Sequence, residues 1–199
     1  MRLNYIGIIG GILAFISLAL PWWTLTLSGQ AMGVPISISA DFSVYPYKSA
    51  VSFMGFSMDI PMNFWFGSTT LALVILGGIL GIIGSIILDK GKTVLAIGGV
   101  LTLLSIIVFA AGLQSEFSKA GGLSIPSPVP GGEPLEIPTI GLFSSGTWNI
   151  MGTTVNYSSY LSFGFWLALI AAIIIFVAMK KAAGAGPITP VAPAAPPPP

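Results

Sequence analysis

The fold is decided by residues Phe64–Leu113, which are FWFGSTTLALVILGGILGIIGSIILDKGKTVLAIGGVLTLLSIIVFAAGL. Two apolar stretches, Phe64–Leu88 and Thr93–Leu113, flank a short turn that holds every charged residue of this segment. Each stretch is long enough, at about 1.5 Å per residue, to cross roughly 30 Å of hydrocarbon as a helix. In the turn, Gly91 is predicted to end the first helix and Thr93 to cap the second. The segment therefore predicts a hairpin of two membrane-spanning helices.

Two further apolar stretches, Tyr5–Leu27 and Tyr160–Met179, are also free of charged residues. Charged residues make up only 7% of the 199 residues, whereas a soluble domain carries about 25%. The sequence therefore predicts an integral membrane α-helical protein with a four-helix transmembrane bundle. The alternative for the first stretch is a cleaved signal peptide, because Arg2 precedes it and small residues follow near 28–31.

The charged residues outside the stretches fall into two groups along the chain. The two ends and the short turn are mainly basic, and hold Arg2, Asp89, Lys90, Lys92, Lys180 and Lys181. The two long loops, 28–63 and 114–159, are mainly acidic, and hold Asp41, Lys48, Asp59, Glu116, Lys119, Glu133 and Glu136. Because basic residues are retained on the cytoplasmic side, we expect a multi-pass protein of the cell membrane with both termini in the cytoplasm.

The long loops contain segments whose apolar and polar residues alternate as in β-strands. Pro21, near the end of the first stretch, favours a kink or helix end, and Thr24–Leu27 alternates like a strand. Other extended segments are predicted at Val34–Ser39, Phe42–Tyr47, Ser49–Ile60 with a break at Gly55, and Leu142–Tyr157. The Pro/Gly-rich segment Gly121–Pro138 is predicted to be irregular. We expect a small extracellular antiparallel β-sheet built from the two loops.

The chain divides into a membrane domain, residues 1–181, and an Ala/Pro-rich tail, residues 182–199. The tail has too few large apolar residues to form a core, so it is predicted to be disordered, with polyproline II character, in the cytoplasm. It serves either to solubilise the chain or as a docking peptide for a proline-binding partner.

The composition excludes many kinds of chemistry. There is no Cys and no His, which removes thiol catalysis, disulfides, imidazole metal sites and Ser–His–Asp triads. The acidic loop residues are widely spaced, and no nucleotide-binding motif is present. The net charge of +1 gives no basic surface for nucleic acid. We expect no catalytic, cofactor or metal site.

Small residues recur at helical spacing within the apolar stretches. Such residues let helix backbones approach closely in lipid. We predict helix packing at Gly7, Gly11, Gly77, Gly81, Gly98, Gly164 and Ala168. These contacts hold either the monomer or a homo-oligomer together.

The hydroxyl side chains within the apolar stretches include those of Ser17, Ser85, Thr102 and Ser105. They either line an uncharged transport pathway or bond within and between helices. A carboxylate relay for proton-coupled transport is not expected, because no ionisable residue lies inside a stretch.

Aromatic and polar residues near the predicted outer interface give two further predictions. Trp22, Trp23, Trp65 and Trp166 lie at span ends, where tryptophan anchors a protein among lipid headgroups. Asn156 begins the only N-glycosylation sequon, Asn156-Tyr157-Ser158, and is a candidate for that modification.

The two halves of the chain share short patterns. Ile9–Leu13 matches Ile97–Leu101, and Phe64–Gly67 has a counterpart in Phe163–Trp166. These likenesses indicate either a tandem duplication of a span–loop–span unit or convergence, because Ile, Gly and Leu are common in membrane helices.

Leu20-Pro21-Trp22-Trp23 at the outer end of the first span, followed by a strand-like loop, resembles the claudin-like proteins. Leu20, Pro21 and Trp23 match the Leu-Pro-x-Trp pattern of that family. The resemblance implies an extracellular sheet on a four-helix bundle, and a role in cell–cell contacts and paracellular barriers. The first loop departs from the family because it has no Gly-Leu-Trp motif and no paired cysteines.

These observations predict a non-enzymatic membrane protein that makes protein–protein contacts through its extracellular loops. Its role would be in adhesion, in envelope organisation or as an accessory subunit, since long structured loops tend to be functional. Its partners would be membrane lipid, other membrane or envelope proteins, or itself as a homo-oligomer, with no nucleic acid. The alternative is a small channel or transporter with an uncharged pathway.

Overall fold

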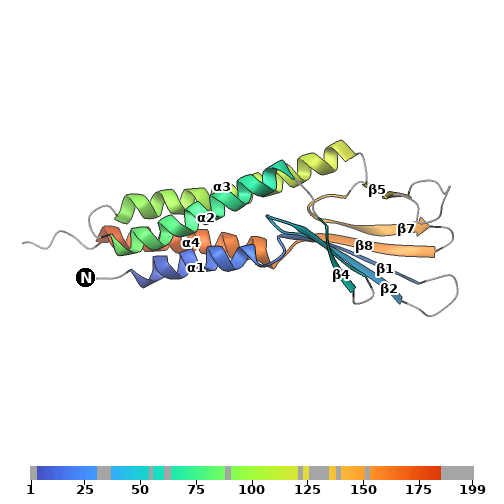
Figure 1. Ribbon diagram of the computed structural model, residues 1–199, viewed down its shortest axis with the longest axis horizontal. Helices are drawn as coiled ribbons and strands as arrows, with labels where there is room; N and C mark the ends of the chain where they lie inside the picture. Colours follow the sequence, from blue (N-terminus) through green and yellow to red (C-terminus); the bar gives the residue numbers. More distant parts are fainter. Residues whose placement is uncertain are drawn as a thin grey trace, which may run out of the picture.

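The computed structural model describes residues 4–30, 37–53, 56–60, 64–87, 91–120, 123–125, 135–137, 140–150 and 153–184. Its helices lie side by side along the long axis of the molecule, and a β-sheet extends from one end of them (Figure 1). The helices are α1 Tyr5–Leu18, α2 Trp65–Ile86, α3 Gly91–Ala120 and α4 Phe163–Gly184. Both α1 and α3 pack against α2 and α4, so the four helices form a ring.

Three of the helices are long and apolar enough to cross a membrane, judged by length and composition: Trp65–Ile86, Gly91–Lys119 and Phe163–Lys181. The first helix differs from the predicted span Tyr5–Leu27, because α1 ends at Leu18 after 14 residues. At about 1.5 Å per residue it measures roughly 21 Å, less than the hydrocarbon thickness. The chain leaves the helix before Pro21 and enters strand β1 at Trp23, so Thr24–Leu27 is a strand, as its alternation predicted.

The helical hairpin of α2 and α3 is present, but its caps differ from the prediction. Gly91 is the first residue of α3 instead of the end of α2, so Thr93 lies inside the helix. A side chain at Gly91 would come within 2.5 Å of the Gly84 carbonyl oxygen, so the absence of a side chain lets the two helices approach at this point. At its other end α3 continues past the predicted span end, Leu113, to Ala120.

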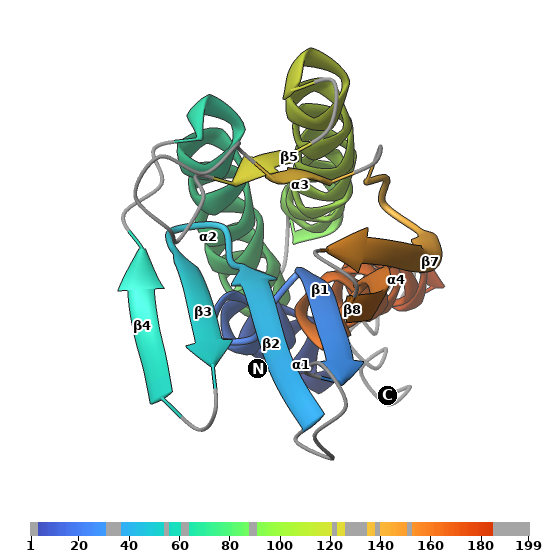
Figure 2. The same ribbon diagram turned by 90° about the vertical axis from the view of Figure 1, so that its right-hand side faces the viewer.

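The sheet has six strands in the order β4-β3-β2-β1-β8-β7, and each neighbouring pair is antiparallel. The strands are β1 Trp23–Gln30, β2 Ser37–Val44, β3 Ser49–Phe53, β4 Phe56–Ile60, β7 Ser144–Ile150 and β8 Thr153–Leu161. Because β1 pairs with β8, both loops contribute to one antiparallel sheet, as the sequence predicted. Figure 2 shows this sheet in front of the helix ends.

A second sheet forms where the sequence predicted irregular structure. Strands β5 Leu123–Ile125 and β6 Leu135–Ile137 pair antiparallel within the Pro/Gly-rich segment. Their alternating triplets are too short for a periodic signal to stand out. Glu133 and the tail beyond residue 184 lie outside the described residues, and α4 extends to Gly184, into the predicted tail.

The two faces of the six-stranded sheet have opposite character, since side chains alternate along each strand and paired residues share a face. What we call the apolar face holds Trp23, Leu25 and Leu27 on β1, with partners that are mostly apolar: Ala40, Phe42, Val44, Tyr157, Ser159 and Leu161. What we call the polar face holds Thr24, Thr26 and Ser28, with partners that are nearly all polar: Ser39, Asp41, Ser43, Asn156, Ser158 and Tyr160.

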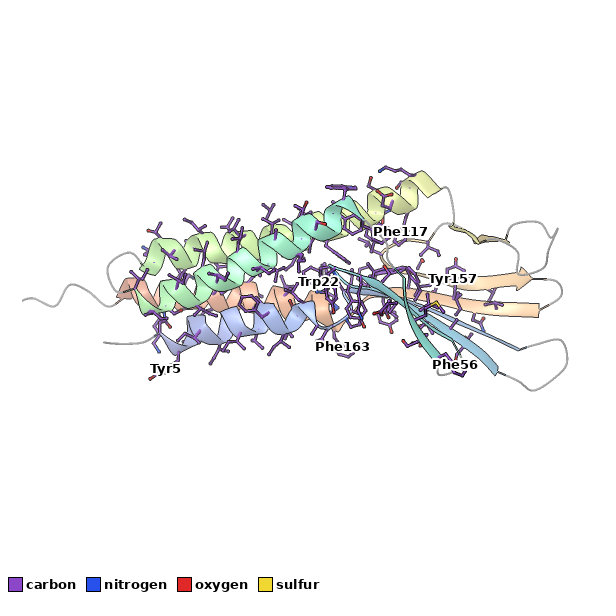
Figure 3. The ribbon with its side chains drawn as sticks, in the orientation of Figure 1. Tyr5, Trp22, Phe56, Phe117, Tyr157 and Phe163 are labelled. Carbon is purple, nitrogen blue, oxygen red and sulfur yellow. The ribbon has the colours of Figure 1, made fainter. Side chains whose placement is uncertain are left out.

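Aromatic side chains join the bundle to the sheet. Trp22 lies where the two meet, and Phe117 lies on the part of α3 that continues beside the sheet (Figure 3). The Trp22 ring centroid is 5.1 Å from that of Phe109, and the Trp23 centroid is 5.0 Å from that of Phe117. The extra turns of α3 therefore cover the apolar face near β1.

Candidate functional site

The small residues predicted for helix packing lie at contacts between helices. A side chain at Gly77 of α2 would overlap Thr102 of α3 and come within 2.9 Å of the Gly98 carbonyl oxygen. A side chain at Gly11 of α1 would lie 2.7 Å from the Gly78 carbonyl oxygen of α2. These glycines therefore allow backbone-to-backbone contact, the geometry expected of small residues in lipid.

The remaining predicted packing positions connect other pairs of elements. Gly7 faces side chains of α2, α3 and α4, and Gly81 faces Ile175 of α4. Gly164 opens α4 against the Leu20 and Pro21 carbonyl oxygens, which would lie 2.6 and 2.8 Å from an added side chain. Ala168 is fully buried. All of these contacts lie within one copy of the chain.

The large side chains of the bundle point the other way. Isoleucine, leucine and valine side chains are at least two-fifths exposed on all four helices: Ile9, Ile12, Ile16, Leu76, Ile79, Ile83, Ile97, Val100, Ile107, Ile170, Ile173 and Val177. The bundle thus has glycines at its helix contacts and large side chains such as Phe66 and Phe109 in its interior, and its outer surface is also apolar. A water-soluble bundle has a polar outer face instead.

The four hydroxyls predicted from the sequence are buried and donate hydrogen bonds to their own helices, whereas the buried Thr70 hydroxyl of α2 has no partner in the described part of the chain. Ser17 bonds the Ala14 carbonyl oxygen at 2.6 Å, and Ser85 bonds that of Gly81 at 2.6 Å. The other two bonds run from Thr102 to the Gly98 carbonyl oxygen at 2.9 Å and from Ser105 to the Thr102 carbonyl oxygen at 2.6 Å. None of the four is more than 4% exposed. Their hydrogens are therefore used within the helices and do not line an open path.

The four predicted interface tryptophans divide into two pairs. Trp65 and Trp166 are 60% and 46% exposed, so both can meet lipid headgroups. Trp22 and Trp23 are 0% and 1% exposed and face protein instead of headgroups. The Trp22 indole N–H donates to the Ser17 carbonyl oxygen at 2.9 Å, whereas Trp23 Nε1 is buried with no hydrogen-bond partner in the described part of the chain.

Backbone hydrogen bonds fix the place where helices become strands. The Trp22 N–H donates to the Val44 carbonyl oxygen at 2.8 Å, and the Ser162 N–H donates to the Trp22 carbonyl oxygen at 2.9 Å. The Gly164 N–H donates to the Pro21 carbonyl oxygen at 2.8 Å. The beginning of the sheet and the beginning of α4 are therefore held together at one junction.

A cationic cluster lies at the turn between β2 and β3. Lys48 Nζ donates to both carboxylate oxygens of Asp59, at 3.0 and 3.1 Å, and lies 5.4 and 5.9 Å from the ring centroids of Tyr45 and Tyr47. The hydrogen bond with Asp59 raises the pKa of Lys48 above the usual lysine value. With Phe64 and neighbouring residues of α2, this turn borders a pocket of about 120 Å³. Because Asp59 already neutralises Lys48, the pocket presents little net charge.

Asn156 is exposed in the middle of the polar face, opposite Ser28 on β1 and Thr147 on β7. The acidic residues predicted to be widely spaced do not converge: across the described ranges no three Asp or Glu side chains lie close enough to hold a metal ion. Among the described residues, the six-stranded sheet is therefore the candidate functional surface. The sequence had not singled out its edge strand β4, because an alternating pentapeptide such as Phe56–Ile60 does not say whether it lies at an edge.

No protein-family model matches this chain, and no curated protein sequence matches it.

Proposed function

We propose that this chain is a non-enzymatic integral membrane protein that displays its six-stranded sheet outside the membrane to make protein–protein contacts. The main support is the outer surface of the bundle, where large apolar side chains such as Ile79 and Ile97 are exposed, while glycines such as Gly77 lie at the helix contacts. Lipid tails solvate such a surface, and water does not. The sheet has the reverse pattern, with a polar face that suits water.

The interior of the bundle favours contact over transport. Backbones touch at Gly77 and Gly98, and of the five buried hydroxyls on the described helices all but that of Thr70 are bonded to their own helices. An uncharged pathway would need polar groups free to replace the hydration shell of a solute. The self-bonded hydroxyls therefore count against the channel alternative.

The proposal extends to the claudin-like resemblance. One antiparallel sheet resting on a ring of four helices is the architecture that the Leu20–Trp23 pattern implies. In this reading the sheet is extracellular, both termini are cytoplasmic, and Asn156 is available to a glycosylating host. The contact surface then lies on the side where adhesion or envelope partners are found.

A cysteine-labelling experiment tests the placement, because the native chain has no Cys. Thr147 on β7 and Lys92 near the start of α3 are both exposed and lie at opposite ends of the molecule. An impermeant maleimide added to intact cells should label Thr147→Cys and leave Lys92→Cys unlabelled until the cells are opened. Labelling of Lys92→Cys alone on intact cells would reverse the orientation, and equal labelling of both would contradict the proposed placement.

A second experiment tests contact against transport. A cleavable thiol cross-linker should join Thr147→Cys to neighbouring envelope proteins in native membranes, and Lys92→Cys serves as the matched control. Purified wild-type protein in liposomes should give no solute flux above that of empty liposomes. Robust flux, or equal cross-linking at both positions, would contradict the proposal.

A further inference from the structure

Strand β4 is an exposed edge of the six-stranded sheet. It pairs with β3 on one side, and no strand within the described ranges pairs with the other side. Every second residue of an edge strand directs its N–H and C=O groups away from the sheet. Proteins usually protect such edges with lysine, proline or a bulge. Strand β4, Phe56-Ser57-Met58-Asp59-Ile60, has neither lysine nor proline, and its one charged residue, Asp59, forms an ion pair with Lys48 of its own chain.

The same strand carries large apolar side chains into solvent. Leu25, Phe42, Val51 and Met58 are successive cross-strand partners in one row of the apolar face. Leu25, at the covered end of this row, is 2% exposed, but Met58, at the edge, is 71% exposed. Phe56 lies two residues away on the same face and is 81% exposed. The apolar face thus continues beyond the part that α3 covers.

We propose that a second copy of the chain covers this edge, by antiparallel pairing of β4 with β4 about a two-fold axis at Met58. Such an isologous interface uses the same patch on both subunits. In this register Met58 faces Met58, Phe56 is opposite Ile60, and Ser57 is opposite Asp59. The two Asp59 carboxylates are not directly opposed, and each retains its own Lys48. The strand is therefore self-complementary over its whole length.

The direction of β4 makes this pairing compatible with one membrane. Figure 1 shows β4 running across the long axis of the molecule, and Figure 2, which looks along that axis, shows β3 and β4 side by side. The local two-fold axis of an antiparallel pair is perpendicular to the sheet, so here it runs along the helix bundle. Both bundles therefore enter the same membrane from the same side. This step rests on the membrane placement proposed above.

Disulfide trapping tests the register. Residues facing each other at the two-fold axis have Cα atoms about 4.5 Å apart in a non-hydrogen-bonded pair, and disulfides accept about 4.4–6.8 Å. Mild oxidation of membranes should convert most of the Met58→Cys protein to a covalent dimer. Thr147→Cys, exposed on the opposite edge strand β7, is the control and should stay monomeric. Equal dimer yields, or no dimer from Met58→Cys, would overturn the proposal.

Charged substitutions at Met58 test whether pairing of β4 with β4 stabilises the dimer. Like charges directly opposite each other weaken strand pairing, so Met58→Lys and Met58→Glu should each be monomeric in lipid nanodiscs, where the wild type is dimeric. Co-expressed with different tags, the two variants should co-purify at least about tenfold better than either with itself. A monomeric wild type, or a Met58→Lys protein that remains dimeric, would refute the interface.

The membrane placement is measured separately in the same variants. Met58 is largely exposed, so Met58→Lys should still resist carbonate extraction and still give sheet-side labelling at Thr147→Cys. Loss of the dimer with normal insertion in Met58→Lys, and rescue by Met58→Glu, supports the interface. A wild type that fails to insert contradicts the proposed membrane function instead.

Discussion

The bundle and the six-stranded sheet differ in the kind of side chain that they expose. In the bundle, glycines such as Gly77 are inside, and side chains such as Leu76 and Ile79 are outside. In the sheet, Trp23 and Leu25 are inside, and Thr26 and Asn156 lie on the outer polar face. The difference fits the proposed membrane placement, because apolar side chains gain no free energy by leaving lipid but do gain it by leaving water. Substitutions at buried and exposed positions should show how far each part depends on burial of apolar side chains and how far on close helix packing.

The largest loss of stability is expected at the junction between the bundle and the sheet, where large aromatic side chains are buried. Trp22 is fully buried, contacts Phe109 and Phe165 edge-on, and donates to Ser17. Trp22→Ala should lower the free energy of unfolding by about 3–5 kcal/mol, since it leaves a large cavity. Unfolding in mixed detergent micelles, followed by tryptophan fluorescence, measures this. Trp65→Ala, at a 60% exposed position, is the control and should change it by less than about 1 kcal/mol.

A smaller loss is expected when the bundle is overpacked. Gly77→Ala would press a methyl group against Thr102 and the Gly98 carbonyl oxygen, which cannot move without separating α2 from α3. Overpacking of this kind costs about 1–3 kcal/mol. The neighbouring variant Leu76→Ala, on the outer surface, should leave the same unfolding curve nearly unchanged. A greater loss from Leu76→Ala than from Gly77→Ala would show that the outer surface, and not glycine packing, holds the bundle together.

The sequence predicts the helices and strands of the two parts, but not the residue at which the bundle ends and the sheet begins. The charge-free stretches around Asp89–Lys92 suffice for the hairpin of α2 and α3, because length and hydropathy decide a membrane helix. The same hydropathy signal predicts too long a first helix, since Trp23–Leu27 is apolar enough for lipid and yet pairs with residues 40–44 and 157–161 in the sheet. Hydropathy alone does not distinguish these two environments.

The junction and the edge depend on contacts between distant parts of the chain. A tryptophan at the end of an apolar run gives the same sequence signal whether it meets headgroups, as Trp65 can, or protein, as Trp22 does. Strand β1 pairs with β8 from the other end of the chain, and this pairing makes β4 an edge. Short-range alternation predicts the strands but not their order.

Removing a self-bonded hydroxyl from the interior of the bundle should have little effect on stability or on solute flux, although hydroxyls are common on the polar face of the sheet. In Thr102→Val the shape is kept, and the Gly98 carbonyl oxygen loses only the side-chain hydrogen bond. The free energy of unfolding should change by less than about 1 kcal/mol. Solute flux in liposomes should equal that of the wild type. A change in flux in Thr102→Val or Ser105→Ala would restore the channel interpretation.

The smallest effect is expected at the ion pair between Lys48 and Asp59, on the solvent side of the boundary. The two side chains are 33% and 65% exposed, so salt and water screen their attraction. Lys48→Gln should lower the melting temperature slightly, and the double variant with Asp59→Asn should lower it no further. The difference should shrink in 1 M salt. A difference that persists there would mean that Lys48 acts through packing on Tyr45 and Tyr47.

The pH dependence of this pair has a definite sign. The hydrogen bond to Asp59 raises the pKa of Lys48 above 10.5, so the folded state holds the lysine proton more tightly than the unfolded state does. The stabilisation is therefore fully present below the lysine pKa of the unfolded chain and is lost as pH rises through the higher pKa of the folded chain. The wild type and Lys48→Gln should differ by a constant amount between about pH 7 and 9 and converge above about pH 10.5. A difference that grew with alkalinity would mean that the lysine proton is bound less tightly in the folded sheet.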